Sequence, residues 1–437
     1  MRNRRVQPVE GLILGFLPSI GGNVLMEIAL WVHEPQPDKR DTVHIPLTPD
    51  AVQRVLLDNS ANYVKPGLVK RILTPTLGRG LLTSDGELWR AQRKIVSASF
   101  TPPAVDALVP VFAEVAEQAA SAWKPGRHDI AAEATAATMH VISAALFSSD
   151  SRLISGEATR YITAALESVT EARLQVLIGL PLVPITLRGL RGKSAQRYLR
   201  RVLGEVVRER LEAGAPDDFT AQMAKALIGQ FPRDEAIDLA VDNAITFYVA
   251  GHETTANAIG WTLFILSRLP ELQDEAAQEC RTAISAGVDS KFPDQVPLLR
   301  AILEESMRLY PPAPRFDREA REKDRLGDHA IEAGDIVSIW PWLIHRHETL
   351  WDRPDEFDHR RFVGDARKAL HRFQYIPFGG GPRTCVGARF AVAEALTILA
   401  HWLAGWRFLP APGHDVAVSG MVTLRPKGGL PLILERR

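Results

Sequence analysis

The chain contains 437 residues, of which 46% are hydrophobic and 24% are charged, and this composition is that of a globular protein with a large core. Lys plus Arg and Asp plus Glu are equal at 52 each, so no net charge draws the molecule to nucleic acid or to an anionic membrane. Its two cysteines, Cys280 and Cys385, are too few for a disulfide framework or a Cys-x-x-Cys zinc site. These counts favour a reducing compartment, and we expect a cytoplasmic protein.

The N-terminus has a basic start and then an apolar run over residues 11–17, which faintly suggests a signal peptide. The run ends at Pro18 and has no small-residue cleavage site behind it. Beyond it, Gly21, Gly22 and Glu27 prevent the roughly 20 apolar residues of a membrane span from accumulating. We expect residues 1–44 to form a packed segment with a short helix, with neither secretion nor a stable membrane anchor.

Short strands are predicted near both ends of the chain, where β-favouring residues are bounded by Gly or Pro, over residues 41–47, 329–339 and 419–434. Helical spacing of apolar residues predicts helices over 50–58, over 103–123 with an interruption at Pro110, and over 297–312 with a stop at Pro311.

The longest predicted helix covers residues 233–270 and contains no proline between Pro232 and Pro270. After Ala244 it is apolar on nearly every face, which is typical of a helix buried through the centre of a protein. The sequence has no repeat, no low-complexity block and no evident linker. A length of 437 residues would ordinarily suggest two or three domains.

Several enzyme classes can be set aside from the motifs. Neither a GxxxxGK[ST] loop nor a GxGxxG fingerprint is present, which argues against a nucleotide cradle. The stretch His252–Ala256 begins like the HExxH zinc helix, but Ala256 stands where the second histidine is needed. The two imidazoles of His345 and His347 would diverge on most backbones, so ordinary polar packing is favoured over a metal site there.

The segment 378–387 reads FGGGPRTCVG and places Cys385 directly before an amphipathic stretch that predicts a helix. At a helix N-terminus the macrodipole and free backbone N–H groups lower the pKa of a thiol and stabilise a thiolate. The glycines at 379–381 permit positive φ angles, so the backbone can fold closely around the sulfur. A small buried hydrophobe is the alternative interpretation of Cys385, and this setting favours a metal-binding thiolate over it.

One cysteine with no partner cysteine or histidine at ligand spacing points to iron whose other ligands come from a porphyrin. Arg383 lies two residues before Cys385, where its guanidinium would clamp a haem propionate.

This pattern resembles the haem-binding signature of the cytochromes P-450, the haem-thiolate monooxygenases, over Phe378-x-x-Gly381-x-Arg383-x-Cys385-x-Gly387. Other family motifs occur in the same order. Glu305-x-x-Arg308 is similar to the family's Glu-x-x-Arg helix, and Arg361 fits the arginine that completes its buried triad. The resemblance spans residues 45–437, and it departs from the usual pattern at His359 and Arg360, where Pro and Glu are more common.

Three further stretches resemble parts of the family's haem site. Ala250–Thr255 is similar to the oxygen-binding part of its long distal helix, Trp89-x-x-x-Arg93 to its propionate-binding helix, and Arg318 to a further propionate arginine. The resemblance implies haem b with Cys385 as its axial ligand, and it implies the following cofactor-binding residues: Trp89, Arg93, Ala250, Gly251, Arg318, Phe378, Gly379, Arg383, Cys385 and Gly387.

The residues themselves also support the implied roles. Glu305 and Arg308 are three apart and share a helix face, so they can pair. A surface salt bridge is the alternative, and a buried network under the cysteine loop is favoured because Arg361 completes it. Thr254 could simply bond back to a helix carbonyl. Beside Glu253, and over a haem, we expect Thr254 and Glu253 to be catalytic.

Motifs between residues 89 and 387 must meet at one haem, so we expect a single mainly α domain over 1–437 with small β-sheets, in which the haem lies between the long helix and the cysteine loop. The expected reaction is hydroxylation of a C–H bond with O₂. The alternatives are a peroxide-driven haem enzyme, an isomerase or a non-catalytic sensor. The acid–alcohol pair Glu253–Thr254 favours oxygen activation.

No flavin or iron–sulfur motif is fused to the chain, so electrons are expected from a separate redoxin or reductase that docks near Cys385. Arg90 and Lys94 are candidates for attracting an acidic partner, against the alternative of a merely solvated basic face. A monomer without nucleic acid is expected. The apolar segment 174–187, Phe247 and the loop after Pro314 are candidate pocket walls and favour a small apolar organic substrate, such as a fatty acid, terpenoid or aromatic.

Overall fold

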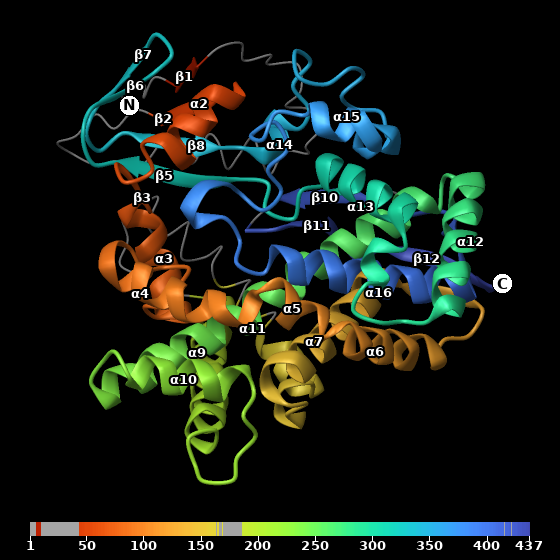
Figure 1. The fold of residues 1–437 in the computed structure, drawn as a ribbon, viewed down its shortest axis with the longest axis horizontal. Helices are drawn as coiled ribbons and strands as arrows, with labels where there is room; N and C mark the ends of the chain where they lie inside the picture. Colours follow the sequence, from red (N-terminus) through yellow and green to blue (C-terminus); the bar gives the residue numbers. More distant parts are fainter. Residues whose placement is uncertain are drawn as a thin grey trace.

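The computed structural model describes residues 6–9, 43–162, 164–165, 168, 186–414, 416–420 and 422–437. In this part the chain is mainly helical with small sheets, as predicted, and the largest sheet and most of the helices occupy different sides of the molecule (Figure 1). The short helix expected within residues 1–44 and nearly all of the apolar segment 174–187 fall outside the described residues.

The largest sheet has five strands in the order β1-β2-β8-β5-β3. β1 runs parallel to β2 and β2 parallel to β8, whereas β5 is antiparallel to both β8 and β3. Their bounds are β1 (Val6–Val9), β2 (Val43–Pro46), β3 (Tyr63–Val64), β5 (Phe316–Ala320) and β8 (Ile336–Ile339). The pairing of β3 with β5 brings the chain after residue 64 beside Arg318, which matters for the site below.

The remaining strands form a three-stranded sheet and two hairpins. The three-stranded sheet is antiparallel in the order β4 (Gly126–Asp129), β12 (Pro431–Arg436), β9 (Trp406–Pro410). The hairpins are β6 (Asp324–Leu326) with β7 (His329–Ile331) and β10 (Ala417–Gly420) with β11 (Leu424–Lys427). Strands therefore occur within all three predicted ranges, and β11 lies against the long helix through a hydrogen bond from Trp261 Nε1 to the Leu424 carbonyl, at 3.1 Å.

The predicted helix over 103–123 is two helices, α5 (Pro102–Asp106) and α6 (Val109–Ser121). Pro110 lies in the first turn of α6, where its missing N–H costs no intrahelical hydrogen bond. The other helices are α2 (Pro49–Gln53), η2 (Arg54–Asp58), α3 (Gly67–Leu77), α4 (Gly86–Ser97), η3 (Ala98–Phe100), α7 (Ile130–Phe147), η4 (Ser151–Leu153), α9 (Leu187–Glu209), α10 (Phe219–Ile228), α12 (Pro270–Ala286), η5 (Phe292–Asp294), α13 (Pro297–Leu309), α14 (Pro341–Ile344), η6 (His359–Phe362), α15 (Gly364–Ala369), η7 (Gly381–Arg383) and α16 (Ala388–Gly405).

The long predicted helix is α11 (Arg233–Leu266), which crosses the centre of the molecule and runs close to α16 (Figure 1). Pro232 precedes it, and Asp234 and Glu235 in its first turn complement the positive end of the helix dipole. It ends before Pro270, which instead starts α12. It packs against α7, α9, α10, α13 and α16, and most of its residues are buried, as predicted.

Within the described residues, α7 is long and apolar enough to cross a membrane by length and composition. It packs against α6 and α11, and Ile130, Val141 and Phe147 are fully buried there. This is the environment of a core helix.

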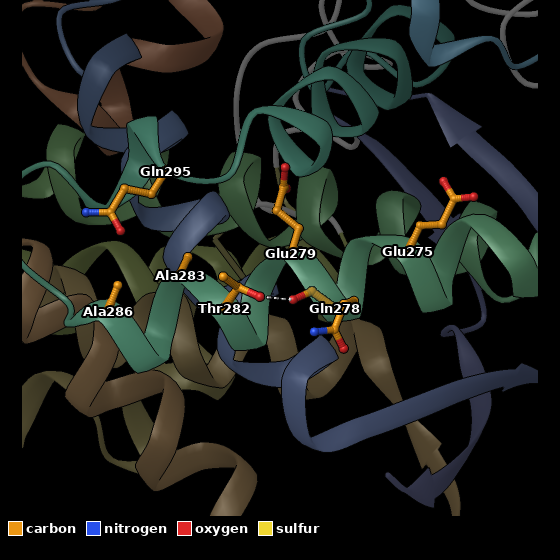
Figure 2. Close-up of a pocket in the computed structure, with 7 residues that line it drawn as sticks. All are labelled: Glu275, Gln278, Glu279, Thr282, Ala283, Ala286 and Gln295. Carbon is orange, nitrogen blue, oxygen red and sulfur yellow. Dashed lines mark hydrogen bonds between the residues drawn. The ribbon is translucent and has the colours of Figure 1, made fainter.

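A groove of about 520 Å³ runs along one face of α12 (Figure 2). Its carboxylates are Glu275 and Glu279, and Glu279 already accepts hydrogen bonds from the backbone N–H groups of Leu298 and Leu299, both at 2.9 Å. The groove is lined by α12 and Gln295, none of which belongs to the predicted site. Glu279 here caps α13, which is a structural role.

Cys280 is fully buried on the same helix, and burial raises the pKa of its thiol to about 12. At pH 8 only on the order of one thiol in 10⁴ would then be ionised, and the sulfur is also shielded from reagents. We expect iodoacetamide to leave Cys280 unmodified in the folded protein and to alkylate it after guanidinium unfolding, as read by mass spectrometry of the peptide. Alkylation of Cys280 in the native state at the rate of a free thiol would contradict this.

Candidate active site

Two accessible stretches interrupt otherwise buried or close-packed elements. α11 is buried from Leu239 to Val249 and again from Thr255 to Leu263, but Ala250, Gly251, Glu253 and Thr254 are accessible. On the cysteine loop, defined as residues 378–387, the side chain of Cys385 is exposed. The residues of α11 and of the cysteine loop that are predicted to contact the haem are therefore accessible to a ligand.

The cysteine loop closes on itself through its backbone. The Cys385 N–H donates to the Phe378 carbonyl at 2.9 Å, and the Thr384 hydroxyl donates to the same oxygen at 3.3 Å. Gly381 has a φ of 66°, and a Cβ there would collide with the carbonyl oxygen of Leu56 on η2. The loop thus lies directly on the backbone of η2, which only glycine permits at this position.

Cys385 is not at the helix N-terminus itself, because α16 starts three residues later at Ala388. Although its side chain is accessible, surrounding protein atoms raise the pKa of the thiol by burial. The Gly387 N–H and the Arg93 guanidinium lower the pKa of the same thiol. A backbone N–H group therefore stabilises the thiolate as expected, and Arg93 adds to its effect, but burial outweighs both, and the net shift in the pKa of the thiol is opposite to the expected one.

Arg93 binds the cysteine loop from α4, and Arg383, which is part of the loop, binds the segment that precedes α4. Arg93 on α4 donates to the Thr384 carbonyl at 2.8 Å, so it holds the loop next to Cys385. Arg383 donates to the Ser84 carbonyl at 3.1 Å, pairs with Asp85, and lies 4.3 Å from the centre of the Trp89 ring. Trp89, Arg93 and Arg383 are thus brought together, and their role toward propionates stays a prediction.

Arg318 and Arg383 form a cationic cluster with Lys65, which sequence reasoning did not select. Burial and the charge of Arg383 lower the pKa of Arg318 to about 10. Burial, Arg318 and Arg383 together lower the pKa of Lys65 well below its usual value. No motif marks Lys65, and only the pairing of β3 with β5 places it opposite Arg318.

This cationic cluster suits an anionic group. Asp85 contributes a carboxylate, but its second oxygen binds Lys70 at 2.5 Å. Cations that lower one another's pKa gain the most from an added carboxylate, because an opposite charge relieves their repulsion in a buried setting. Together with an accessible thiol and small accessible residues on α11, this donor set fits a haem with its propionates.

Glu253 and Thr254 point to different partners. The Thr254 hydroxyl donates to the Ala250 carbonyl at 3.0 Å, as a helical threonine commonly does. The Glu253 carboxylate accepts from the Thr423 hydroxyl at 2.7 Å and lies 3.6 Å from Arg425. Thr423 lies between the strands of the hairpin β10–β11 and Arg425 lies in β11, and no motif marks either residue. The hairpin therefore holds Glu253 at a fixed place beside the accessible part of α11.

Glu305 and Arg308 on α13 form a fully buried ion pair, with Arg308 Nε at 2.7 Å from Glu305 Oε2 and Nη2 at 2.8 Å from Oε1. Arg361 lies 3.5 Å from Glu305 and also donates to the Arg353 carbonyl. Arg308 uses its remaining N–H groups on the carbonyls of His345, Pro354 and Glu356. The structure thus brings together the three predicted members and encloses the pair in hydrogen bonds.

His345 connects this network to the cysteine loop. Its Nε2 accepts a hydrogen bond from the Ile376 N–H at 2.8 Å, two residues before the loop begins. Burial and the neighbouring Arg308 and Arg346 lower the pKa of His345 to about 3, so the ring is a neutral acceptor. His347 is bonded to Thr349 instead, so the two histidines serve separate backbone turns.

Removing one partner of the buried pair leaves a charge uncompensated, which costs about 3–5 kcal/mol. We therefore expect Arg308→Met to lower the free energy of unfolding by about that amount in urea titrations, with loss of the native cysteine-loop geometry. The matched control is Arg367→Met. Arg367 pairs with Glu304, which is also on α13, but the Arg367 side chain is 43% exposed. It should cost about 0–1 kcal/mol. Equal losses in the two variants would show that the buried pair has no special role.

Comparison with known proteins agrees with this geometry. The Cytochrome P450 family profile matches residues 38–430. The chain is 31% identical to cyclooctatin synthase of Streptomyces melanosporofaciens, over 90% of this chain and 86% of that one. It is 30% identical to cyclooctat-9-en-7-ol 5-monooxygenase of the same organism, over 89% and 85%. The fold is similar to that of the cyanobacterial CYP120A1 bound to retinoic acid, with a TM-score of 0.79 and 22% identity over 91% and 90% of the chains. The chain therefore belongs to the cytochrome P450 family of monooxygenases.

Proposed function

We propose that this protein hydroxylates a C–H bond of a small apolar organic substrate with O₂, using haem b bound through Cys385. The observation that carries the proposal is the pairing of two features. Cys385 presents an accessible sulfur from a closed loop, and α11 presents an accessible Glu253–Thr254 pair within a buried helix. An acid and an alcohol at this place supply what proton-coupled oxygen activation requires.

The haem would be held by Cys385 at its iron and by Lys65, Trp89, Arg93, Arg318 and Arg383 at its propionates. Ala250 and Gly251 are small enough to admit a flat macrocycle beside α11. Phe378, Gly379 and Gly387 would border its other face. When bound through a thiolate, haem supplies the reductive activation of O₂ and the transfer of one oxygen atom.

The roles of this chain's own groups follow from their positions. The Thr254 hydroxyl can leave the Ala250 carbonyl and donate its proton toward the distal side. The Glu253 carboxyl is held by Thr423 and Arg425, so a rotation away from the hairpin would be needed for it to pass a proton inward. General acid catalysis requires such a group within hydrogen-bond reach or one water away.

A separate redox protein is the proposed electron donor. Arg90 and Lys94 are exposed on α4, on either side of Arg93, and form no ion pair with any residue that the structure describes. A depression of about 410 Å³ borders the cysteine loop, and its three arginines each pair with a carboxylate. Arg90 and Lys94 are thus exposed cations that could attract an acidic partner near Cys385.

The apolar character of the substrate is supported by Phe247, which lies on α11 within an aromatic cluster with Phe100 and Phe219. One of the relatives is named cyclooctat-9-en-7-ol 5-monooxygenase. A largely hydrocarbon substrate is in line with both observations.

Ligation by Cys385 predicts the red-shifted Soret band of a thiolate opposite CO in the reduced protein under carbon monoxide. We expect Cys385→His to lose this band or lose haem, because imidazole donates less electron density than thiolate. Cys280→Ser is the matched control and should leave the spectrum unchanged. Persistence of the thiolate band in Cys385→Ala would contradict the assignment of the ligand.

Proton delivery predicts different outcomes for the two residues of α11. Thr254→Ala should still consume reductant and O₂ but release more peroxide and less product, because no hydroxyl at position 254 donates a proton toward the distal side. Glu253→Gln should lower turnover, since positioned proton transfer is typically worth about 10²- to 10⁴-fold. Product yield per NAD(P)H and peroxide release measure both effects.

The matched control is Thr262→Ala, since the Thr262 hydroxyl bonds back to Ala258 in the same way but is buried two turns away. Its coupling should equal that of the wild type. Unchanged coupling in Thr254→Ala would refute the role of the threonine. Wild-type activity with peroxide alone, and none with O₂ and any redox partner, would favour the peroxide-driven alternative.

A further inference from the structure

The loop of residues 78–84 connects α3 to α4, and we call it the 78–84 loop. At its end nearest the cationic cluster, Arg383 donates to the Ser84 carbonyl and Lys65 donates to the Leu82 carbonyl. Leu82 is 39% exposed, whereas its neighbours Leu81 and Thr83 are buried. The loop therefore keeps one large apolar side chain free while its backbone is held.

The other end of this loop is bonded to α11. Asp242 accepts the Arg79 N–H at 2.7 Å, and the Asn243 side-chain oxygen accepts the Leu81 N–H at 2.9 Å. The Asn243 amide also donates to Gln92 at 2.5 Å, and Gln92 returns to the Arg79 carbonyl at 3.1 Å. Two adjacent side chains of one helix thus replace the hydrogen bonds that the loop backbone would make in a regular element.

The glycines of the loop allow this close approach. Gly78 has a φ of 61°, and a Cβ there would collide with the carboxylate of Asp242. A Cβ on Gly80 would lie 2.9 Å from the Asp242 carbonyl oxygen. At Gly78 and Gly80 the loop backbone therefore lies directly against α11 and its side chains, with no side chain of the loop in between.

Asp242 has a second partner on a different helix. Its other carboxylate oxygen lies 2.5 Å from Arg200 Nη2, and Arg200 extends from α9 with a half-exposed side chain. Asp242 itself is only 5% exposed, so its charge depends on these few partners. One carboxylate thus joins α9, α11 and the 78–84 loop.

We propose that Asp242 is a positioning residue that couples α9 to the 78–84 loop, and that α9 acts on Asp242 through the Arg200 side chain. When Arg200 is withdrawn, the buried carboxylate must seek another partner or solvent, and its hold on the Arg79 N–H weakens. The loop is then no longer held against α11, and Leu82 moves with the loop.

The consequence for binding rests on the proposed haem site, whereas the coupling itself does not. Along the chain, Leu82 lies between Ser84 and the pair Arg79 and Leu81. The Ser84 carbonyl is bound by Arg383 of the cationic cluster, and the N–H groups of Arg79 and Leu81 are bound by α11. A ligand placed between the cationic cluster and the accessible part of α11 would therefore meet its side chain. The position of Leu82, and through it the shape of the site, would follow the state of the Arg200–Asp242 pair.

Hydrogen–deuterium exchange of the haem-loaded protein tests the coupling. We expect Arg200→Ala to speed exchange in peptides covering residues 78–84 on the order of tenfold, the change expected for loss of a charge-assisted hydrogen bond. Asp242→Asn should speed it at least as much, and the double variant no more than Asp242→Asn alone. Faster exchange confined to α9 in Arg200→Ala would overturn the proposal.

The matched control is Arg201→Ala, because Arg201 is the next residue of α9, is exposed, and pairs with Glu205 on its own helix at 3.4 Å. It should leave exchange in the 78–84 loop unchanged. An effect equal to that of Arg200→Ala would show a general loosening of α9 and would also overturn the proposal. Arg200→Ala alone suffices for the test if Asp242→Asn fails to fold.

Binding of two azoles tests the consequence for the site. Imidazole reports on haem access, and 1-phenylimidazole adds a ring that reaches further into the distal side. Leu82→Ala and Arg200→Ala should each change the Kd of 1-phenylimidazole several-fold and leave that of imidazole unchanged, while Arg201→Ala changes neither. Coupled exchange with unaltered 1-phenylimidazole binding would remove Leu82 from the site. Neither result depends on whether the protein hydroxylates a substrate.

Discussion

The buried ion pair of Glu305 and Arg308 constrains the whole proximal side of this protein. Two charges with no exposed surface are tolerated only when every remaining donor and acceptor is satisfied. Arg308 meets that requirement by binding three backbone carbonyls between residues 345 and 356, and Glu305 by accepting the Asp358 N–H. An irregular stretch of chain is thereby fixed around one helix. His345, in that stretch, then accepts a hydrogen bond from the Ile376 N–H and so holds the segment that leads into the cysteine loop.

The distal side is organised by α11 in a similar way. Its buried length gives it little freedom, and side chains in its middle part hold other segments. Asp242 and Asn243 seat the 78–84 loop, and Glu253 binds Thr423 and Arg425 beside the C-terminal hairpin. The accessible Ala250 and Gly251 lie between these attachments, and Thr254 directly follows Glu253. α11 is thus the element to which segments on both sides of Ala250 and Gly251 are attached.

Charge is distributed unevenly although the chain as a whole is neutral. Burial lowers the pKa of Lys65, Arg318 and Arg383, and the charge of neighbouring arginines lowers the pKa of Lys65 and Arg318 further. Such a cluster is unfavourable by itself and becomes favourable with an anionic ligand, since each cation then gains a partner. The structure thus contains a local excess of positive charge that suits an anionic group, which composition could not reveal.

The sequence by itself determined the features that depend on neighbours along the chain. The cysteine loop, the i, i+3 pair on α13 and the unbroken helix over most of 233–270 follow from local spacing, glycine and proline, and the structure has them. Family motifs added Arg361, Trp89 and Arg318. Lys65, Arg425 and the Arg200–Asp242 pair were missed because each acts through a residue that is distant along the chain. The pKa of the Cys385 thiol was misjudged for a related reason. Local groups lower it as expected, but burial by the folded chain raises it further, and burial is a property that only the tertiary structure decides.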